Sequence, residues 1–383
     1  MRQALACTAI VAGLMIAAVP PAPASAWEAL TPAQRNFAPL VLPVAVFGRD
    51  DRTALPAKYR SLREKIGLLF NLRSRTVCTA FCLAPDIVAT AGHCLFSIAG
   101  ERPPRLADFW FARNYDASRE YAHIAGHSAR AAAQHVMSGS THLNVRPPID
   151  ATRDWALVRL ARPICNKGVL AVRALPIDQI EKEAAAKRVF QISYHRDFAP
   201  WKPAYSQACS VGRNFGSGGW TAVARDFYEP SLLVLHTCDT GGASSGSPLL
   251  IDTGHGPEVI GINVGTYVQS KVLIHDGQVA ERLKADTVAN TAVGAAAFAA
   301  KLDVFQHAAI LGSRQKIREL QVALKRHGLY AGHADGIYGP ELRRAIEAYE
   351  RMQGLPVTGL ATQALLKRLG GKPTGGRTVR ARS

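Results

Sequence analysis

Acidic residues are scarce in this sequence of 383 residues. It has 29 Asp and Glu against 46 Lys and Arg, which gives a formal net charge of +17 at pH 7. Such a charge attracts polyanions, and both an anionic cell envelope and nucleic acid are polyanions of this kind. No single basic run has the form of a groove-binding motif, so we expect no specific nucleic-acid partner. The same charge is typical of the solvated surface of a basic secreted protein.

Long apolar runs free of charge are lacking after the first twenty residues. The run from Ala4 to Val19 follows Arg2, ends in prolines, and is shorter than a spanning helix normally requires. The segment Ala24-Ser25-Ala26 then offers a small-x-small cleavage site before Trp27. The sequence therefore predicts a signal peptide, export to the periplasm or the extracellular space, and no transmembrane segment. It does not predict the oligomeric state.

A Cys-x-x-Cys pair is also missing. Removal of the signal peptide takes Cys7 with it, and the even set that remains in an exported chain favours disulfides over a metal site. His123 and His127 are four residues apart, but no adjoining carboxylate completes a ligand set. We therefore predict no metal and no cofactor. The remaining cysteines are Cys78, Cys82, Cys94, Cys165, Cys209 and Cys238.

Short apolar runs bounded by Gly, Pro and Asp dominate from about residue 40 to residue 275. Many short strands over this length predict a mainly β domain built as an antiparallel double barrel. Residues 286–302 are alanine-rich with helical spacing of Phe298 and Leu302, so we predict a helix that closes this domain. The predicted strands include Leu40–Val46, Ile87–Ala91, Trp155–Leu160, Val189–Tyr194, Leu232–His236 and Val259–Val264.

Three polar motifs within this domain point to nucleophilic catalysis. DTGGASSGSPLL, Asp239 to Leu250, is a glycine-lined turn that presents Ser245 beside backbone N–H donors. ATAGHC ends an apolar run at His93, and DWALVRL opens another at Asp154. The chain order His93, Asp154, Ser245 is one of the orders found in Ser-His-Asp hydrolases, so these are the candidate catalytic residues.

Together, TAGHC, DWALVRL and GASSGSP resemble the trypsin/chymotrypsin superfamily of serine proteases. VFGRDDR at Val46–Arg52, SGSP after the nucleophile and VIGINVG at Val259–Gly265 are most similar to the bacterial glutamyl-endopeptidase-like branch. The resemblance spans roughly Val46 to Gly265. It implies two β-barrels of the chymotrypsin type, with the site between them.

The resemblance also implies a role for each residue. Ser245 would be the nucleophile, His93 the general base and acid, and Asp154 the group that orients the imidazole. The backbone N–H groups of Ala243 and Ser245 would form the oxyanion hole. Two positions depart from the family: Ala243 replaces the usual glycine, and Ser244 replaces the aspartate that receives a freed N-terminus in trypsin.

The substrate pocket implied by the resemblance contains Asp239, Thr240, Asn263 and Gly265. Asp239 lies where trypsin keeps its pocket carboxylate, which favours cleavage after Lys or Arg. Glutamyl endopeptidases also carry Asp-Thr here, however, while Asn263 replaces the histidine expected of the Glu-specific branch. We therefore expect basic or broad specificity, and the alternative of Glu specificity remains open.

The resemblance further implies that Cys78 pairs with Cys94 and closes the loop that carries His93. For the others we prefer Cys209 with Cys238, which would tie the segment before the nucleophile turn to the second barrel. Cys82 and Cys165 would then pair.

Helical periodicity replaces the strand pattern from about Ser313, and predicts three helices ended in turn by Gly328, Gly354 and the region after Leu369. The amino-acid sequence of Leu320–Leu369 resembles the peptidoglycan-binding domain found at the ends of bacterial wall enzymes. Leu342 and Glu350 depart from its common threonine and glutamine. Peptidoglycan is the partner this implies, with a spacer or docking role as the alternative. The matching positions include Gln321, Asp335, Gly336, Tyr338, Gly339 and Gly359.

The sequence as a whole predicts a secreted serine endopeptidase that cleaves protein or peptide substrates and is anchored to the cell wall. The alternatives are a catalytically silent wall-binding protein and a hydrolase of peptidoglycan stem peptides. The predicted organisation is a signal peptide over residues 1–26, a candidate prosegment or extension over 27–43, a protease domain over 44–305, a linker over 306–312, a helical peptidoglycan-binding-like domain over 313–370, and a basic tail over 371–383.

Overall fold

A computed structural model of the chain describes residues 45–96, 104–117, 120–126, 128–199, 201–207, 209–213, 215, 219–275 and 278–370, with the side chains of 268–288 excepted. The predicted signal peptide, the candidate prosegment up to residue 43, the basic tail and His127 lie outside the described residues.

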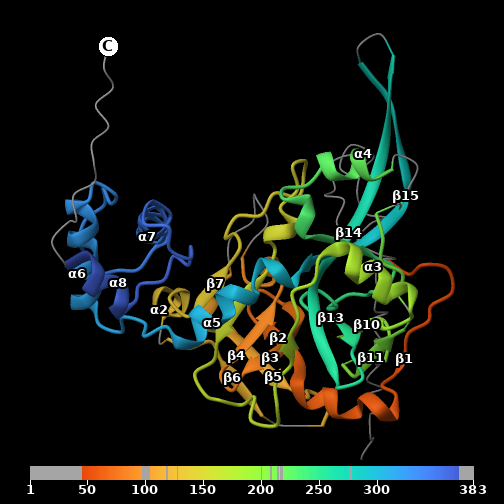
Figure 1. Cartoon of the computed structure of the whole chain (residues 1–383), viewed down its shortest axis with the longest axis horizontal. Coiled ribbons are helices and arrows are strands. Elements are labelled where there is room, and N and C mark those ends of the chain that lie inside the picture. Colours follow the sequence, from red (N-terminus) through yellow and green to blue (C-terminus); the bar gives the residue numbers. More distant parts are fainter. Residues whose placement is uncertain are drawn as a thin grey trace, which may run out of the picture. The chain divides into compact units, whose positions relative to one another are not determined.

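The first sheet has the strand order β6-β5-β2-β3-β4-β8-β7, and all of its pairs are antiparallel (Figure 1). A bridge between Ile124 and Leu160 joins the end of β6 to the end of β8, so the sheet closes on itself as a barrel. Its strands are β2 (Ile66–Asn71), β3 (Thr76–Ala84), β4 (Ile87–Thr90), β5 (Phe109–Arg113), β6 (Tyr121–His123), β7 (Val136–Ser138) and β8 (Ala156–Arg159).

The second sheet runs β1-β11-β10-β13-β14-β15-β12, with β9 parallel to β14 at its edge. A bridge between Val211, beyond β11, and His236 of β12 brings its two sides together. Its strands are β1 (Thr53–Ala54), β9 (Ala171–Val172), β10 (Val189–Tyr194), β11 (Pro203–Ser206), β12 (Leu233–His236), β13 (Pro248–Asp252), β14 (Pro257–His275) and β15 (Gln278–Gly294).

The predicted fold class, mainly β with two antiparallel barrels, is confirmed by these two sheets. Large side chains are buried in the strands of the first barrel and beside them: Phe81, Phe109, Phe111 and Trp155, which directly precedes β8, are 2% exposed or less. Burying each of these side chains stabilises the fold by about 2 to 3 kcal/mol relative to exposure. Apolar packing therefore holds the strand ends that carry the polar motifs.

Helices are short and peripheral in this region. In α3 the buried residues Ile177, Ile180 and Ala184 fall at helical spacing on one face, which packs in the core of the second barrel. The helices are α2 (Ala129–Ala133), α3 (Ile177–Ala185), α4 (Gly219–Arg225) and α5 (Ala299–His307), with 3-10 turns at Ala57–Lys65, Gly92–Cys94, Leu106–Asp108, Ala151–Arg153, Pro230–Leu232 and Ala295–Ala297.

One prediction about local structure is wrong. Residues 286–294 are not helical but belong to β15, and the helix α5 begins only at Ala299. Ala289 and Ala292 are fully buried in β15, which lies between β14 and β12, so these small side chains serve close strand packing rather than helix propensity. Of the predicted strand Leu40–Val46, only Ala45 and Val46 lie within the described residues, and they are not in a strand: Ala45 O accepts from Thr240 N.

The C-terminal region consists of α6 (Arg314–Arg326), α7 (Pro340–Met352) and α8 (Gln363–Gly370), as its periodicity predicts. Ser313 caps α6 by accepting a hydrogen bond from Lys316 N. The three helices enclose their own core, in which Leu320, Leu324 and Ile346 are fully buried. This region therefore folds around an interior of its own.

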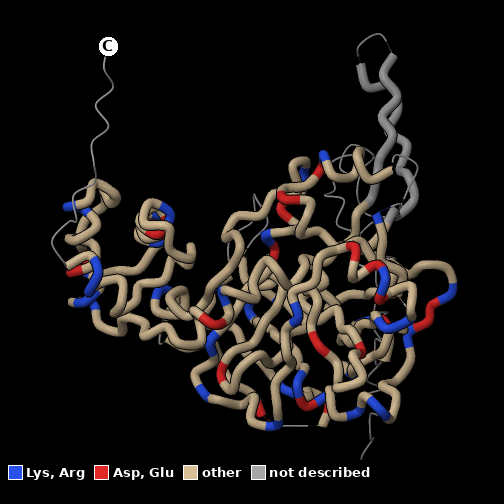
Figure 2. The backbone as a smooth tube through the Cα atoms, viewed as in Figure 1, with Lys and Arg blue, Asp and Glu red and all other residues tan. Residues whose placement is uncertain are grey.

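Lys and Arg are spread along the described chain with acidic positions between them, rather than gathered in one segment (Figure 2). Among the described residues, no helix combines the length and the apolar character needed to cross a membrane.

Candidate active site

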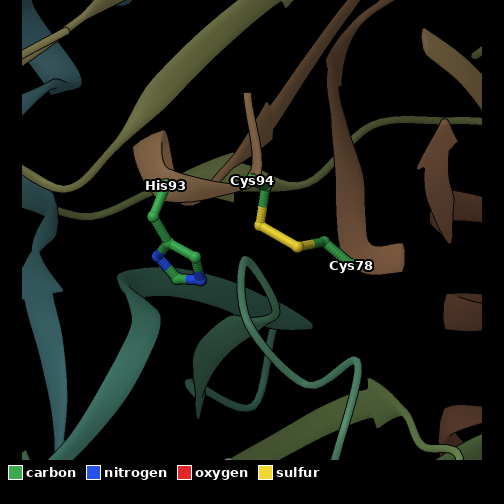
Figure 3. Close-up of side chains that lie close together, drawn as sticks. All are labelled: Cys78, His93 and Cys94. Carbon is green, nitrogen blue, oxygen red and sulfur yellow. A yellow bond between two sulfur atoms is a disulfide. The ribbon is translucent and has the colours of Figure 1, made fainter. Parts of the chain in front are cut away.

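His93 lies on a short 3-10 turn, Gly92–Cys94, directly after β4. The buried strand β4 delivers this turn, and the disulfide between Cys94 and Cys78 ties it to β3, beside the imidazole (Figure 3). The backbone that carries His93 is therefore held on both sides.

Asp154 meets His93 at two points. Its Oδ2 lies 2.7 Å from His93 Nδ1, and its Oδ1 accepts a 2.8 Å hydrogen bond from the backbone N–H of His93. Asp154 is 8% exposed and sits between a 3-10 turn and β8. Burial works against a charged imidazole, but the charge of Asp154 and its hydrogen bond outweigh burial and raise the pKa of His93.

Ser245 is presented by a turn of the second barrel that is bonded to the first barrel. Thr79 of β3 donates from its N–H to Ser245 O at 2.9 Å and from its hydroxyl to Ala243 O at 2.8 Å. Gly246 has a φ of +82°, and a Cβ there would overlap Thr90 of β4. The turn thus packs against the strand that leads to His93.

Four backbone N–H groups of this turn have no acceptor within the described residues, those of Gly241, Gly242, Ala243 and Ser245, and the last two are the pair predicted from the sequence. The amides of Ser244, Gly246 and Ser247 are all bonded within the protein. Ala243 has a φ of +83°, a left-handed conformation that strains a residue with a Cβ. An oxyanion hole requires backbone donors that are not already bonded within the protein, and the N–H groups of Ala243 and Ser245 meet this requirement.

Within the described residues, the side chain of His93 is bonded to Asp154, and no hydrogen bond joins it to the Ser245 hydroxyl. Such bonds are often long in ligand-free sites and shorten when substrate binds. The structure therefore joins two of the three predicted catalytic residues directly and brings the third to the same barrel edge.

Asp239 does not present a free carboxylate. It is 2% exposed, and its two oxygens accept 2.8 Å hydrogen bonds from the backbone N–H groups of Phe47 and Asp51. The adjacent Thr240 donates its N–H to Ala45 O at 3.0 Å. Asp239 and Thr240 thus hold the segment Ala45–Arg52 against the base of the nucleophile turn.

Arg52 fixes the far end of this segment. Its side chain is 4% exposed and forms ion pairs with Asp50 and Asp197, both at 2.8 Å, while a second guanidinium nitrogen lies 3.2 Å from His195 Nδ1. Burial and the nearby guanidinium lower the pKa of His195 to about 4. The motif VFGRDDR therefore has a structural role: it connects Asp239 to Asp197 and His195. The sequence did not predict this role.

The other predicted pocket residues lie on β14. Gly265 pairs with Thr291 of β15, and Asn263 is 2% exposed with its side chain between His236 and Ser244. Sequence reasoning missed His236. The one local feature of the sequence that could have pointed to His236 is that this polar residue ends the apolar run Leu232–Leu235.

The structure contains the disulfides Cys78–Cys94, Cys82–Cys165 and Cys209–Cys238, the three pairs named from the sequence. Cys78, His93 and Cys94 form the one cluster of metal-type ligands among the described residues. Because both sulfurs are in a disulfide, they cannot act as thiolate ligands.

In the C-terminal region, the family-matching residues are engaged in folding. Gln321 is fully buried and donates to Tyr330 Oη, Asp335 Oδ1 and Ile337 O, while its own oxygen accepts from Gly336 N. Gly339 is the residue that precedes the first turn of α7. The hydroxyl of Tyr338 donates to Gly359 O at 2.6 Å and so joins two of the matching residues. These contacts hold the turns of the domain in place.

The two departures in this region are also internal. Leu342 is 1% exposed, and Glu350 accepts hydrogen bonds from the backbone of Thr358 and Gly359. Burial raises the pKa of Glu350, against the effect of these bonds.

Comparison with protein families finds that residues 78–262 match the trypsin-like peptidase domain and residues 313–369 match the putative peptidoglycan binding domain. The comparison with curated proteins gave no match.

Among solved structures, the chain is similar to a Glu endopeptidase bound to MPD, with 17% identity over 68% of this chain and 98% of that one and a TM-score of 0.41. A thermostable serine protease from an extremophilic microorganism shares 17% identity over 61% of this chain and 91% of that chain, with a TM-score of 0.37. The protease Anisep from Arthrobacter nicotinovorans shares 14% identity over 60% and 89%, also with a TM-score of 0.37.

Proposed function

Because the chain carries a trypsin-like peptidase domain followed by a peptidoglycan-binding domain, we propose that it is a secreted serine endopeptidase that works through an acyl-enzyme on Ser245. Its substrates are proteins or peptides, and the C-terminal domain holds it at the bacterial cell wall. The single observation that carries the catalytic part is the two-point contact of Asp154 with His93.

In the first step, His93 takes the proton of the Ser245 hydroxyl as that oxygen attacks the substrate carbonyl. The Nδ1–H of His93 donates to Asp154, so Nε2 is the basic nitrogen. The ionised Asp154 then stabilises the imidazolium that forms. A serine hydroxyl is a poor nucleophile without such a neighbour.

The carbonyl oxygen becomes an oxyanion in the same step and accepts from the N–H groups of Ala243 and Ser245. Each such donor contributes about 3 kcal/mol to the transition state. His93 next returns its proton to the leaving amine, which leaves the acyl group on Ser245. Water, activated by the same imidazole, then releases the acyl group and restores the enzyme.

The test is covalent labelling of residues 27–383 with a fluorophosphonate, followed by peptide mapping. We expect one label on Ser245, none in Ser245→Ala, and a strongly reduced rate in His93→Ala. Mapping matters because Ser244 and Ser247 lie in the same turn. Absence of labelling in folded, disulfide-intact protein would favour the silent wall-binding alternative, or a latent form that awaits N-terminal processing.

For the residue before the cleaved bond, we propose broad specificity. The contacts of Asp239 with Phe47 and Asp51 support this over a preference for Lys or Arg, since its carboxylate is occupied by backbone donors. Profiling of cleavage sites in a denatured proteome tests the point. Dominance of Lys and Arg would contradict it, and dominance of Glu would show that Asn263 can replace the histidine of the Glu-specific branch.

Export and wall anchoring are supported by the three disulfides and by the C-terminal domain. Sedimentation with purified sacculi tests anchoring, and deletion of residues 313–383 should abolish it while labelling of Ser245 persists. Digestion of sacculi in parallel with casein separates an endopeptidase, which should cleave casein, from a hydrolase of stem peptides.

A further inference from the structure

A buried polar chain runs behind the nucleophile turn, and the proposed mechanism does not use it. It begins at His236, the last residue of β12, which is fully buried. It passes through Asn263 of β14, which is 2% exposed, to Ser244, which is 3% exposed and directly precedes the nucleophile. His236 Nε2 lies 3.1 Å from Asn263 Oδ1, and Asn263 Nδ2 donates to Ser244 O at 3.3 Å.

Asn263 contacts the turn on both sides of Ser245. Its backbone O accepts from Gly246 N at 2.8 Å, and its backbone N donates to Ser247 O at 2.9 Å. Its side chain reaches Ser244 O, which also accepts from Ser247 N at 3.1 Å. Asn263 therefore bonds to three residues that flank the nucleophile, and a change in its orientation would move Ser245 and the N–H groups beside it.

The direction of these bonds follows from the carbonyl at their end. Ser244 O can only accept, so the amide nitrogen of Asn263 must face it and the amide oxygen must face His236. His236 must then carry its proton on Nε2. Its Nδ1 is buried and has no hydrogen-bond partner within the described residues. Burial lowers the pKa of His236 to about 4, against the effect of its bond to Asn263, so the ring is neutral where His93 can act as a base.

We propose that His236 is a positioning residue: its Nε2–H locks the Asn263 amide in the one orientation that holds the Ser244 carbonyl, and this sets the oxyanion donors beside Ser245. The proposal rests on the proposed function, because positioning has meaning only for a reactive serine. His236 touches no substrate. Its loss should lower the rate of acylation and leave the binding of peptide substrates nearly unchanged.

Two amide replacements test this as a matched pair. In His236→Gln the side-chain amide nitrogen can occupy the place of Nε2 and still donate to Asn263 Oδ1. In His236→Asn the shorter side chain puts its amide nitrogen at the place of Nδ1, too far from Asn263 Oδ1 to donate to it. We expect His236→Gln to react with the fluorophosphonate within about threefold of the native rate. We expect His236→Asn and His236→Leu to react about tenfold or more slowly, with kcat lowered and KM retained.

Tyr59→Phe is the stability control, because it removes a partly buried 2.6 Å hydrogen bond to Asp252 of β13, on the same barrel as His236. It should lower the melting temperature without slowing labelling. If the Gln, Asn and Leu variants are slowed equally, or only in proportion to their loss of stability, the positioning role is wrong. If native protein is not labelled even after removal of residues 27–43, the proposed function fails and the positioning role fails with it.

A second readout does not depend on activity. The ¹⁵N shifts of the His236 ring at pH 7 report which nitrogen carries the proton, and His236→Gln identifies the signal. We expect a neutral ring protonated on Nε2. Protonation on Nδ1 would overturn the proposal whatever the labelling rates.

Discussion

Two glycine-bearing turns of this molecule use their polar groups in opposite ways. In the nucleophile turn, the N–H groups of Ala243 and Ser245 remain without an acceptor in the described structure. In the turn Asp335–Gly339 of the C-terminal domain, Gln321 donates to the carboxylate of Asp335 and to Ile337 O, and accepts from Gly336 N. The first turn leaves donors unbonded, while the second uses its polar groups in contacts that hold the fold. A motif that identifies a domain therefore need not be its binding site.

The largest effect on the function proposed for the first turn should come from a change at Asp154, the hydrogen-bond partner of His93. Asp154→Asn should lower kcat/KM about 10³- to 10⁴-fold, because the amide no longer fixes the imidazole tautomer or stabilises the imidazolium. Steady-state hydrolysis of a peptide ester checks this. Equal activity of the variant and the native protein would show that Asp154 has no catalytic role.

The pH profile gives a related prediction. His93 must be neutral to act as a base, and Asp154 raises its pKa, so the acid limb of kcat/KM should lie above the ordinary histidine value of 6.5. Asp154→Asn removes the charge and leaves the effect of burial, so the limb should move to lower pH. A limb that does not move would mean that another group controls it.

In the second turn, the largest effect should be on stability. Gln321→Leu keeps the volume of the side chain but leaves Asp335, Gly336 N and Ile337 O without their partner. We expect the C-terminal domain to lose about 3 kcal/mol, seen as an earlier thermal transition in the full-length protein. Labelling of Ser245 should not change, and a loss of labelling would mean that the two domains are not independent in folding.

A smaller effect on stability is expected at Asp51, whose backbone N–H donates to Asp239. Burial, and to a lesser degree the charge of Asp239, raise the pKa of Asp51 to about 6. The folded state therefore favours protonated Asp51, and this contribution to stability is present below pH 4 and lost as the pH rises through about 6. Asp51→Asn should stabilise the protein by about 1 kcal/mol at pH 7.5, after allowance for its partial exposure, and by almost nothing at pH 4. Urea unfolding at both pH values is the check.

The smallest effect should come from Ala243→Gly. Glycine tolerates a φ of +83° without strain, which favours the folded turn by about 1 kcal/mol, but its greater freedom in the unfolded chain offsets part of this gain. We expect a slightly higher melting temperature and an unchanged or faster labelling rate. Slower labelling would show that the Cβ of Ala243 helps to hold its N–H in place.

Local patterns predicted well wherever one strand or helix could be read alone. The strand Val189–Tyr194 and the helical stripe of α7 follow directly from apolar periodicity. The same reasoning failed at residues 286–294, where an alanine-rich segment is a strand because β14 and β12 lie on either side of it. Small side chains suit both a helix and a crowded sheet, so only the neighbours decide.

The sequence by itself determined the two-domain plan, the mainly β class and the candidate residues His93, Asp154 and Ser245, because strand periodicity and motif chemistry are written over short stretches. Only the tertiary structure decided that Asp239 holds residues 188 and 192 positions earlier in the chain and that His236 bonds to the side chain of Asn263. Hydrogen bonds between distant segments depend on strand register and closure. No local run of residues carries that information.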